Sequence, residues 1–442
     1  MEASARYRDR QHLYSPRLQN TEPKPKSDKG DGGSGAEPIL PRSHDTETPT
    51  AVHPIDMNRA PPARFRDAAE RGSDSLANRS RKFGLSHLGQ ALIEPYRVET
   101  MENTEQKFAL AMISTGGCRP FAAMVIGEQV IAVNAFLEIP DIGLDPLRAD
   151  SIRALLDDWE NSLDSLKRAR AYYQNYEQNQ FLRRKSLPIE RVQFHPPVDA
   201  PRQVFCTGAN YRQHVIGLML GDPDMRGVGR EAVNDPAELR KLAEATMDER
   251  AAGGTPYVFL RLPNTLIGAH ENVHIPKHFT KPDWELELAV VIGRSAKNVA
   301  AADAPSYIAG YAIINDLTAR ELIFRKDMPA MGADWLQGKN WRDSGPFGPF
   351  LVPSCFVTDP YDLKIQLWLN DRLMQDESTS DMVISIERQI EYLSSIATLN
   401  PGDVIATGSP AGNGSHYGVF IQPGDEITGE ITGLGRQHLK FS

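Results

Sequence analysis

Two glutamates and a later aspartate have the types and spacing to hold a cation. Glu285 and Glu287 stand in the stretch DWELELAVVIG, where apolar residues alternate as in a β-strand. Side chains at positions i and i+2 of a strand share a face, so the two carboxylates point the same way. Asp316 follows a second apolar run, YIAGYAII, which also has the composition of a strand. Three carboxylates without cysteine or clustered histidine nearby favour Mg²⁺, Mn²⁺ or Ca²⁺ over zinc.

Spacing alone also allows a simpler interpretation of these carboxylates. Glu285 and Glu287 would form the solvated face of an edge strand, and Asp316 would be a turn residue. The β-branched run that follows Glu287 indicates burial on at least one side. Two like charges that are buried together need a cation, so burial would favour the metal site.

Other residues with possible chemical roles occur where predicted strands end. His214 lies in NYRQH directly after the strand VFCTG, and we expect it at a strand-to-loop exit. Arg320 stands four residues after Asp316, and its guanidinium can bind a substrate carboxylate through two parallel bonds. Lys339 lies on a tight loop before SGPFGPFLV, and Thr407 lies in the glycine-rich loop ATGSPAG, whose N–H groups could bind an oxyanion. Any one of these loops alone would pass for an ordinary hairpin turn.

Other histidines of the globular part carry no comparable signal. A single histidine is more often structural than catalytic, and neighbouring motifs distinguish only His214. We therefore interpret six histidines as structural: His195, His270, His274, His278, His416 and His438.

The composition of the 442 residues excludes several classes of protein. A net charge of −9, with Lys and Arg scattered along the chain, argues against a nucleic-acid-binding face. Cys118, Cys206 and Cys355 are too widely separated for a metal motif and fit a reducing compartment. No apolar run approaches the roughly 20 residues of a membrane helix, and the first residues lack the pattern of a secretory signal. Glu2 and Asp9 weaken a transit peptide, so we expect a cytoplasmic protein.

The patterning divides the chain into three parts. Residues 1–105 are rich in Pro, Ser, Gly and charged residues and are predicted to be a disordered extension, either a regulatory tail or a segment preceding a native start at Met101. Residues 106–190 are predicted to form a small β-rich domain with a hairpin and an amphipathic helix over 148–178. Residues 191–442 contain many short strands and are predicted to form the catalytic domain. The expected fold class is a β-dominated α+β fold.

Two helices are predicted among these strands. One spans 382–398, with isoleucine and leucine recurring on one face. The other lies within the segment 217–256, where Asp235 is the N-cap and Pro236 takes the first helical position. This second helix is polar nearly all round, so we expect it on the surface as a candidate lid over the site.

Taken in order, five segments resemble the fumarylacetoacetate hydrolase family over roughly residues 200–442: NYRQH, DWELELAVVIG, GYAIINDLTARE, GKNW with SGPFGPFLV, and ATGSPAG. No segment is specific by itself, but the ordered set is. The resemblance implies a mixed β-sandwich roll, a Mg²⁺ or Mn²⁺ cofactor with Ca²⁺ as an alternative, a homodimer and a small 2-oxo acid substrate. The typical substrate is a 2,4-dioxo acid, such as an acylpyruvate; neither nucleic acid nor a membrane is implied as a partner.

The resemblance also implies roles for individual residues. The family's metal ligands correspond to Glu285, Glu287 and Asp316. Its catalytic residues correspond to His214 and Lys339. Its substrate-binding residues correspond to Tyr211, Arg320, Lys339 and Thr407. In such a site a neutral His214 could deprotonate a water that attacks the distal carbonyl, and Lys339 could stabilise the oxyanion that results.

The chain departs from the family pattern at two positions near these residues. Family hydrolases commonly carry a glutamate three residues after the histidine, but this chain has Gly217, so His214 lacks its usual orienting partner. Relatives often carry a glutamine three residues after the arginine, where this chain has Ile323, which indicates an altered substrate pocket. Acids in the lid segment that could replace the glutamate are Asp222, Asp224 and Glu231.

Three functions follow from these observations. The leading one is metal-dependent hydrolysis of a C–C bond in a 2,4-dioxo acid. The alternative is decarboxylation, isomerisation or (de)hydration of a related 2-oxo acid, which the missing glutamate favours because only hydrolysis needs a strong base and a positioned water. A non-catalytic protein that binds metal and oxo acids is the third, and the retained His214 and Lys339 argue against it.

Overall fold

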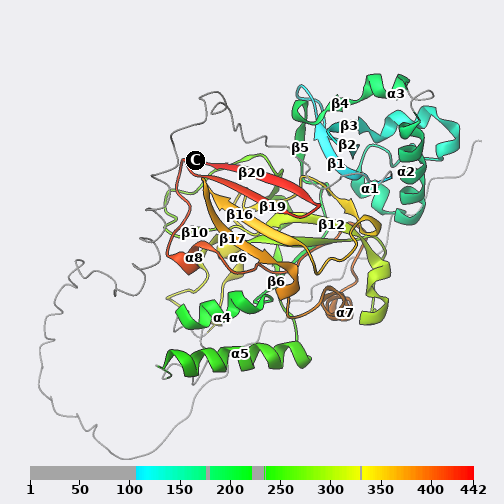
Figure 1. The fold of residues 1–442 in the computed structure, drawn as a ribbon. Helices are drawn as coiled ribbons and strands as arrows, with labels where there is room; N and C mark the ends of the chain where they lie inside the picture. The colour runs from blue at the N-terminus through cyan, green and yellow to red at the C-terminus, as the bar shows by residue number, and fades with distance from the viewer. Residues whose placement is uncertain (1–105, 176–179, 222–232, 234, 329–330) are drawn as a thin grey trace, which may run out of the picture. The chain divides into compact units, whose positions relative to one another are not determined.

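The protein is described by a computed structural model that places residues 106–175, 180–221, 233, 235–328 and 331–442 (Figure 1). The predicted disordered extension, residues 1–105, lies outside the described residues, as do Asp222, Asp224 and Glu231 of the lid segment. The described chain is a mixed α/β fold that is rich in strands. None of its helices is long and apolar enough to cross a membrane.

The first part of the described chain forms a five-stranded antiparallel sheet. Its strands lie in the order β4-β3-β2-β1-β5, and turns at Gly116-Gly117 and Gly127-Glu128 join the first three in succession. The strand bounds are β1 (Ala109–Ser114), β2 (Phe121–Ile126), β3 (Gln129–Ala132), β4 (Leu187–Pro188) and β5 (Gln193–His195).

Shorter helices replace the single helix predicted over 148–178. α1 (Ile152–Leu156) and α2 (Trp159–Gln174) are separated because the backbone of Asp158, with φ −143° and ψ 61°, lies outside the region that an α-helix allows. A further helix, α3 (Gln180–Lys185), follows. The apolar residues of these helices pack into one core with strands β1 and β2.

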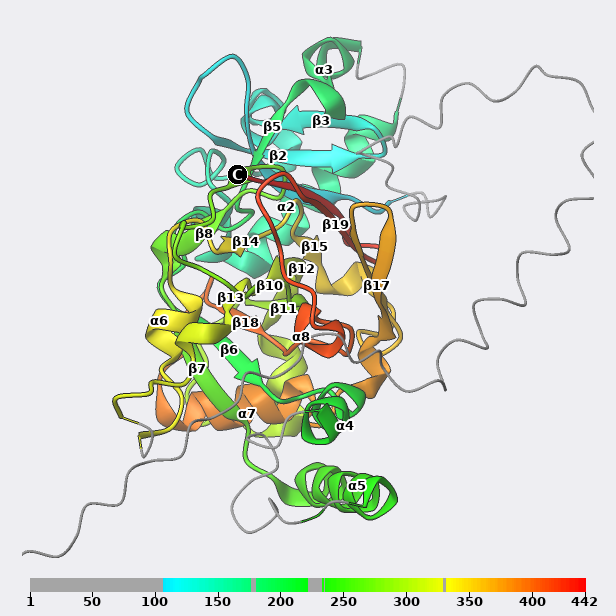
Figure 2. The same cartoon turned by 90° about the vertical axis from the view of Figure 1, so that its left-hand side faces the viewer.

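A six-stranded sheet forms the centre of the second part of the chain. Its order is β15-β12-β11-β18-β6-β7, so β11 lies in the interior and β7 at an edge (Figure 2). β11 runs antiparallel to both of its neighbours, β12 and β18. The strand bounds are β6 (Val204–Gly208), β7 (Tyr257–Arg261), β11 (Leu286–Ile292), β12 (Ile308–Asn315), β15 (Val352–Pro353) and β18 (Val404–Ala406).

A second five-stranded sheet packs against one face of β11. Leu286, Leu288 and Val290 share a core with the apolar residues of this sheet, whose order is β17-β16-β19-β20-β9. Ala289 and Val291, on the opposite face of β11, belong to the core that includes β1 and β2. Because both faces are covered, β11 is apolar along its whole length after Glu287. The bounds are β9 (Asn272–Val273), β16 (Lys364–Leu369), β17 (Arg372–Ser378), β19 (Glu426–Ile431) and β20 (Gly435–Phe441).

Short elements complete the fold around one end of the six-stranded sheet. The helix predicted over 382–398 is present as α7 (Ile386–Ile396), and the side chain of Ser385 caps it by accepting from the Arg388 N–H. Two two-stranded sheets pair β10 with β13 and β8 with β14. The remaining bounds are β8 (Leu266–Ile267), β10 (Pro282–Asp283), β13 (Thr318–Ala319), β14 (Gly345–Pro346), α6 (Trp335–Lys339) and α8 (Gly414–Tyr417).

Helices α4 (Arg212–Gly221) and α5 (Pro236–Gly253) lie side by side near one end of the central sheet (Figures 1 and 2). α5 begins where the sequence predicts, since Asp235 accepts from the Ala237 N–H and Pro236 takes the first position. The helix is not polar all round, because Ala243 and Met247 pack with Ile216 and Met219 of α4. α5 therefore lies on the surface and covers the helix that carries His214.

Candidate metal and proton-transfer site

Three carboxylates gather at one end of strands β11 and β12. Glu285 precedes β11, Glu287 lies within it and Asp316 follows β12, and one oxygen of each lies within 4.8 Å of the others. The register that pairs Leu286 with Asn315 brings them together, and the Glu285 N–H donates to Asn315 Oδ1 (3.0 Å). All three carboxylates are buried and β11 has a neighbouring strand on each side. The interpretation of this stretch as a solvated edge strand is therefore wrong.

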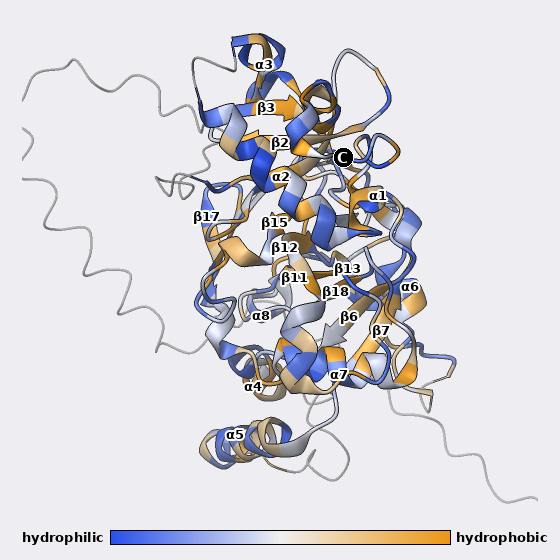
Figure 3. Ribbon diagram, turned by 90° about the vertical axis from the view of Figure 1, so that its right-hand side faces the viewer, coloured by the Kyte–Doolittle hydropathy of each residue, from blue (hydrophilic) through white to orange (hydrophobic). Residues whose placement is uncertain are grey.

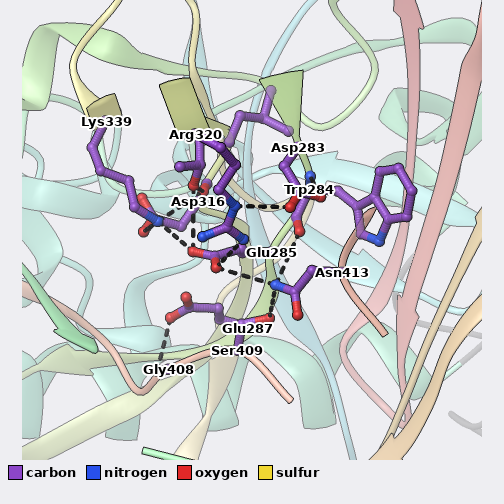
Figure 4. A network of polar contacts seen from close by, with 12 residues as sticks. Asp283, Trp284, Glu285, Glu287, Asp316, Arg320, Lys339, Gly408, Ser409 and Asn413 are labelled. Atoms are coloured by element: carbon purple, nitrogen blue, oxygen red, sulfur yellow. Dashed lines mark hydrogen bonds and ion pairs between the residues drawn. The ribbon is translucent and has the colours of Figure 1, made fainter. Parts of the chain in front are cut away.

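Two basic side chains bind these carboxylates directly. Lys339 is the last residue of helix α6, so the prediction that it lies on a tight loop is wrong. Its Nζ contacts the carboxylates of both Glu285 and Asp316 (Figure 4). Burial alone would lower the pKa of Lys339, but Asp316 and Glu285 outweigh it and raise that pKa, so the ammonium stays charged. Arg320 donates from Nε to Asp283 (2.8 Å) and from Nη2 to Glu285 (2.6 Å).

Arg261, the last residue of β7, is a third buried cation that the sequence analysis missed. Its Nε donates to Asp316 Oδ1 (2.8 Å), and its Nη1 donates to Ser344 Oγ (2.7 Å). The available signal was a single arginine in the otherwise apolar stretch YVFLRL, because a buried guanidinium needs a carboxylate partner.

The pKa values of the two glutamates are shifted in opposite directions. Burial favours the neutral form of Glu285, but Arg320 and Lys339 outweigh it and hold the pKa well below its usual range. Burial raises the pKa of Glu287, and the nearby Asp316 and Glu285 raise it further. Glu287 Oε2 accepts a hydrogen bond from the Gly408 N–H (2.8 Å), but the carboxylates around it crowd negative charge at this end of the cluster.

This donor set fits a divalent metal ion. The ligands are buried carboxylate oxygens, and the raised pKa of Glu287 indicates an uncompensated negative charge where a cation would bind. Around them, the four carboxylates of Asp283, Glu285, Glu287 and Asp316 outnumber three cationic side chains. Added positive charge is therefore favourable at this site.

His214 lies close to the acidic cluster but in a helix rather than a loop. The prediction of a strand-to-loop exit is wrong, because α4 begins at Arg212, before this residue. The side chain is 5% exposed, and burial lowers its pKa to about 3, so the imidazole is neutral at neutral pH. The carboxylate with the largest effect on this pKa is Glu285, which Arg320 and Lys339 already bind.

His416, interpreted above as structural, lies beside His214. The two ring centroids are 5.2 Å apart at an interplanar angle of 48°. Burial lowers the pKa of His416, so this ring is also neutral at neutral pH. Sequence reasoning missed it because His416 lies in a four-residue helix, α8, about 200 residues along the chain, and only packing brings the two rings together.

Asp283 and Asn413, also missed by sequence reasoning, attach α8 to the acidic cluster. Asp283 accepts from the N–H groups of Gly414 (2.6 Å) and Ser415 (3.1 Å) while it binds Arg320. Asn413 Nδ2 donates to Glu285 Oε1 (3.1 Å), as Figure 4 shows. The turn that carries His416 is thus fixed by the residues that surround the carboxylates.

The residues expected to bind substrate are buried around the same cluster. Thr407 donates from Oγ1 to the carbonyl of Leu288 (2.9 Å), and its own carbonyl accepts from Asn210 Nδ2 (2.8 Å). Tyr211, next to Asn210, is fully buried, which raises its pKa. The segments NYRQH and ATGSPAG are therefore held side by side, and the substrate-binding roles stay predictions.

Ile323, where relatives often carry a glutamine, packs against Gly338, the residue before Lys339. Its side chain is 4% exposed, and its Cγ1 would lie 2.8 Å from a Cβ added at Gly338. A glycine at this position therefore lets α6 approach Ile323 closely, and the isoleucine packs under the residue that precedes Lys339.

Comparisons with known proteins agree with the arrangement of these elements. The family model described as "Fumarylacetoacetate (FAA) hydrolase C-terminal" matches residues 203–441. The protein named oxaloacetate tautomerase FAHD2B, mitochondrial, from Bos taurus is 32% identical over 311 residues, which is 70% of this chain and 82% of that protein. The fumarylacetoacetate hydrolase domain-containing protein 2 homolog of Dictyostelium discoideum is 31% identical over 324 residues, 70% of this chain and 92% of the relative.

A solved structure has a similar fold. Maleylpyruvate hydrolase from Sphingobium sp. SYK-6, crystallised with manganese(II) and pyruvate, superposes with a TM-score of 0.54 at 25% sequence identity. The match covers 75% of this chain and 98% of that one. The likeness therefore extends beyond the residues that the family model matches.

Proposed function

Because this chain belongs to the fumarylacetoacetate hydrolase family, we propose that it is a divalent-metal-dependent enzyme that interconverts the keto and enol forms of a 2-oxo dicarboxylic acid such as oxaloacetate. Relatives from Bos taurus and Homo sapiens that are 32% identical are named oxaloacetate tautomerases, which supports this reaction over the hydrolysis expected from the sequence. One observation supports this choice. Among the described residues, His214 has no carboxylate partner of its own that would raise its basicity, because Glu285 is already bound by Arg320 and Lys339 and position 217 is a glycine.

The metal would be held by Glu285, Glu287 and Asp316. Mg²⁺ and Mn²⁺ are the proposed ions, with Ca²⁺ as an alternative, because all three prefer oxygen ligands. When bound, such an ion acts as a Lewis acid that polarises a 2-oxo group and stabilises negative charge on it.

His214 is the proposed base. Its pKa of about 3 keeps the ring neutral, so a ring nitrogen is free to take a proton from C3 of the substrate at neutral pH. His214 then gives this proton to the enolate oxygen, which forms the enol; in the reverse direction it takes the proton from that oxygen and returns it to C3. Removing a proton next to a polarised carbonyl needs a weaker base than activating a water, which suits a histidine without a carboxylate partner.

The buried cations would bind the two anionic ends of the substrate. Lys339 stays protonated and would donate a hydrogen bond to the oxygen that gains negative charge. Arg320 uses Nε and Nη2 for Asp283 and Glu285, so Nη1 is the donor we assign to a substrate carboxylate. A dicarboxylic acid matches this pair of cations better than a neutral substrate does.

C–C hydrolysis of an acylpyruvate is the second candidate. It is supported by the 25% identity to a maleylpyruvate hydrolase, and it requires His214 to activate a water molecule. One assay separates the two functions: metal-free protein is mixed with the enol of oxaloacetate or with acetylpyruvate, with and without Mg²⁺ or Mn²⁺. Metal-dependent acceleration of the loss of enol absorbance supports the tautomerase; metal-dependent release of acetate and pyruvate would replace it with the hydrolase.

We propose that two copies of the chain pair along the edge strand β7. No other strand of the described chain pairs with its outer side, and Figure 3 shows β7 coloured as largely hydrophobic. Tyr257 and Leu260 in this strand and Leu262 just after it are 46%, 58% and 43% exposed. An exposed apolar edge favours association with another strand. Leu260→Glu is expected to halve the mass measured by light scattering, whereas Leu373→Glu, a control on β17, leaves the mass unchanged.

The cellular compartment of this protein has two candidates. The composition favours the cytoplasm, whereas several relatives carry "mitochondrial" in their names. Fractionation of cells that express the full chain distinguishes the two locations.

A further inference from the structure

The two imidazoles beside the acidic cluster contain buried nitrogens without good hydrogen-bond partners. Nδ1 of His214 and both ring nitrogens of His416 belong to this group among the described residues. The backbone of His214 acts to raise the pKa of His416, but neither ring nitrogen of His416 has a hydrogen-bond partner within the geometric limits. A structural histidine usually has its nitrogens satisfied, so this arrangement points to groups that exchange protons or receive a ligand.

His416 occupies the space into which a side chain at position 217 would extend. A Cβ built on Gly217 would lie 2.6 Å from Nε2 and 2.9 Å from Cδ2 of His416. His214 and Gly217 are three residues apart in α4, so their side chains would share a face of the helix. Glycine is a poor helix former, and its presence at position 217 of α4 is explained by the imidazole ring of His416, which leaves no room for a Cβ.

The ring of His416 has a well-supported position. Asp283 fixes the N–H groups of Gly414 and Ser415, and Asn413 bonds to Glu285. The same carboxylates that surround the metal position therefore determine where His416 stands. A residue placed only to fill space would not require this connection to the acidic cluster.

We propose that His416 is a positioning residue for His214 and takes the place of the carboxylate that the chain lacks at position 217. The inference rests on the proposed function. In the reaction, the C3–H bond of the substrate breaks and a bond from that hydrogen to one nitrogen of His214 forms, with the electron pair remaining on the substrate. A neutral nitrogen of His416 accepts a hydrogen bond from the other N–H of His214, and no proton leaves the pair. When His214 gives its proton to the enolate oxygen, which forms the enol, or returns it to carbon, which forms the keto acid, both rings are neutral again.

A second histidine in this place also limits the reaction. A neutral imidazole stabilises the protonated form of His214 less than a carboxylate does, so His214 is a weaker base than in a histidine–glutamate pair. Such a base is sufficient for an acidified C3–H bond but poor for activating water. The His214–His416 pair therefore selects proton transfer over hydrolysis.

The first test replaces His416 with alanine in the full chain, loaded with Mn²⁺. We expect kcat for enol–keto conversion to fall by about 10- to 100-fold, with KM and the affinity for Mn²⁺ within about two-fold of the wild type. Added imidazole should restore part of kcat, because it can occupy the vacated space. His438→Ala, a histidine of β20 that bonds to Thr428, is the matched control and should keep the wild-type rate. An unchanged kcat in His416→Ala, or no recovery with imidazole, would overturn the proposal.

The second test uses the shared space and does not depend on activity. Gly217→Ala should lower the melting temperature when His416 is present and should be tolerated in the His416→Gly background, because the added Cβ then has room. Equal effects in both backgrounds would contradict the proposed packing. If the wild type accelerates neither enol–keto conversion nor acetylpyruvate hydrolysis with any metal, the proposed function is wrong. The packing of His416 against position 217 is still tested in that case, because the melting temperatures do not depend on activity.

A third variant exchanges the partners. Gly217→Glu combined with His416→Gly introduces a carboxylate three residues after His214 and removes the ring that blocks it. We expect this double variant to release acetate from acetylpyruvate faster than the wild type does, by about 10-fold or more. Gly217→Glu alone serves as the comparison and should be poorly folded. No gain of hydrolysis in a well-folded double variant would argue that the histidine pair does not determine the reaction.

Discussion

The two sides of the site differ in how their polar groups are satisfied and in burial: the carboxylates and His214 are buried, whereas His416 is half-buried. On the acidic side, Lys339, Arg261 and Arg320 bind the carboxylates of Asp283, Glu285 and Asp316. On the histidine side, three ring nitrogens of His214 and His416 lack good partners. The acidic side is arranged to hold fixed charge in place, whereas the histidine side leaves lone pairs and N–H groups available for moving a proton.

This difference follows from the cost of burying charge. An ionised group removed from water must be paired, and breaking one buried pair destabilises a protein by about 3–5 kcal/mol. A neutral imidazole costs much less to bury, so it can remain without a partner until substrate binds. The comparison predicts that changes on the acidic side affect metal binding and folding, whereas changes on the histidine side affect turnover.

The largest expected effect is that of Asp316→Asn or Glu285→Gln. Each removes a metal ligand and leaves Lys339 with one carboxylate partner fewer, so we expect metal binding to be lost and activity to fall by at least about 1000-fold. Calorimetric titration with Mn²⁺ and the enol assay measure both quantities. Asp376→Asn, an exposed carboxylate on β17 that pairs with Lys364, is the control. Wild-type turnover in either ligand variant would remove the acidic side from the mechanism.

His214→Ala is expected to have the next largest effect and to act on turnover alone. Loss of a general base typically lowers kcat by about 10²- to 10⁴-fold. The affinities for Mn²⁺ and for oxalate should stay within about three-fold, because the carboxylates are unchanged. His274→Ala, at an exposed position after β9, should behave as wild type. If His214→Ala weakens metal binding as much as turnover, the two sides are not separable.

Lys339→Met should destabilise the metal-free protein. It leaves Glu285 and Asp316 without the ammonium that joins them, and we expect a loss of about 3 kcal/mol in the free energy of unfolding. Mn²⁺ should restore more stability to this variant than it adds to the wild type, because the ion supplies the missing charge. Lys364→Met, which breaks an exposed pair, should change stability by less than about 1 kcal/mol. Equal effects of the two lysines would contradict the difference between buried and exposed pairs.

The effect expected to be smallest near neutral pH is a dependence of stability on pH. The folded pKa of His214 is about 3 and the unfolded value is 6.5, so between these pH values the unfolded chain binds a proton that the folded chain does not. Stability is therefore lost as pH falls below 6.5, at up to about 1.4 kcal/mol per pH unit from this residue. In denaturant titrations, His214→Gln should show a shallower loss than the wild type. Parallel profiles would indicate that His214 is not buried in its neutral form.

The acidic side could be predicted from sequence because local patterns encode it. The alternation in DWELELAVVIG and the aspartate after YIAGYAII depend on strand periodicity, and the start of α5 depends on the cap at Asp235. Sequence reasoning found neither α4 nor the break at Asp158, because NYRQHVIGLML has no clear helical stripe and a single residue with non-helical backbone angles divides α1 from α2. These features depend on tertiary packing.

The histidine side could not be predicted, because it is formed by long-range contact. Sequence reasoning recognised Gly217 as a departure from the family pattern. The residues next to it in the sequence do not indicate that the ring of His416, from α8, fills the space where a side chain at position 217 would lie. Arg261 and Asp283 were missed for the same reason, since their partners lie far along the chain. Apolar repeats with a period of two or 3.6 residues identify a single strand or helix. A pair such as His214–His416 depends instead on how separate elements pack against each other.

The central claim is that this site moves a proton at C3 of a 2-oxo acid without breaking the carbon skeleton. One NMR time course tests it: the Mn²⁺-stripped, Mg²⁺-loaded full chain is incubated in D₂O with oxaloacetate and acetylpyruvate together, and Asp316→Asn with the same metal gives the background. We expect faster exchange of the C3 hydrogens of oxaloacetate for deuterium than in the background sample, with no enzyme-dependent acetate or CO₂. Enzyme-dependent formation of acetate and pyruvate, or of CO₂, without accelerated exchange would contradict the account.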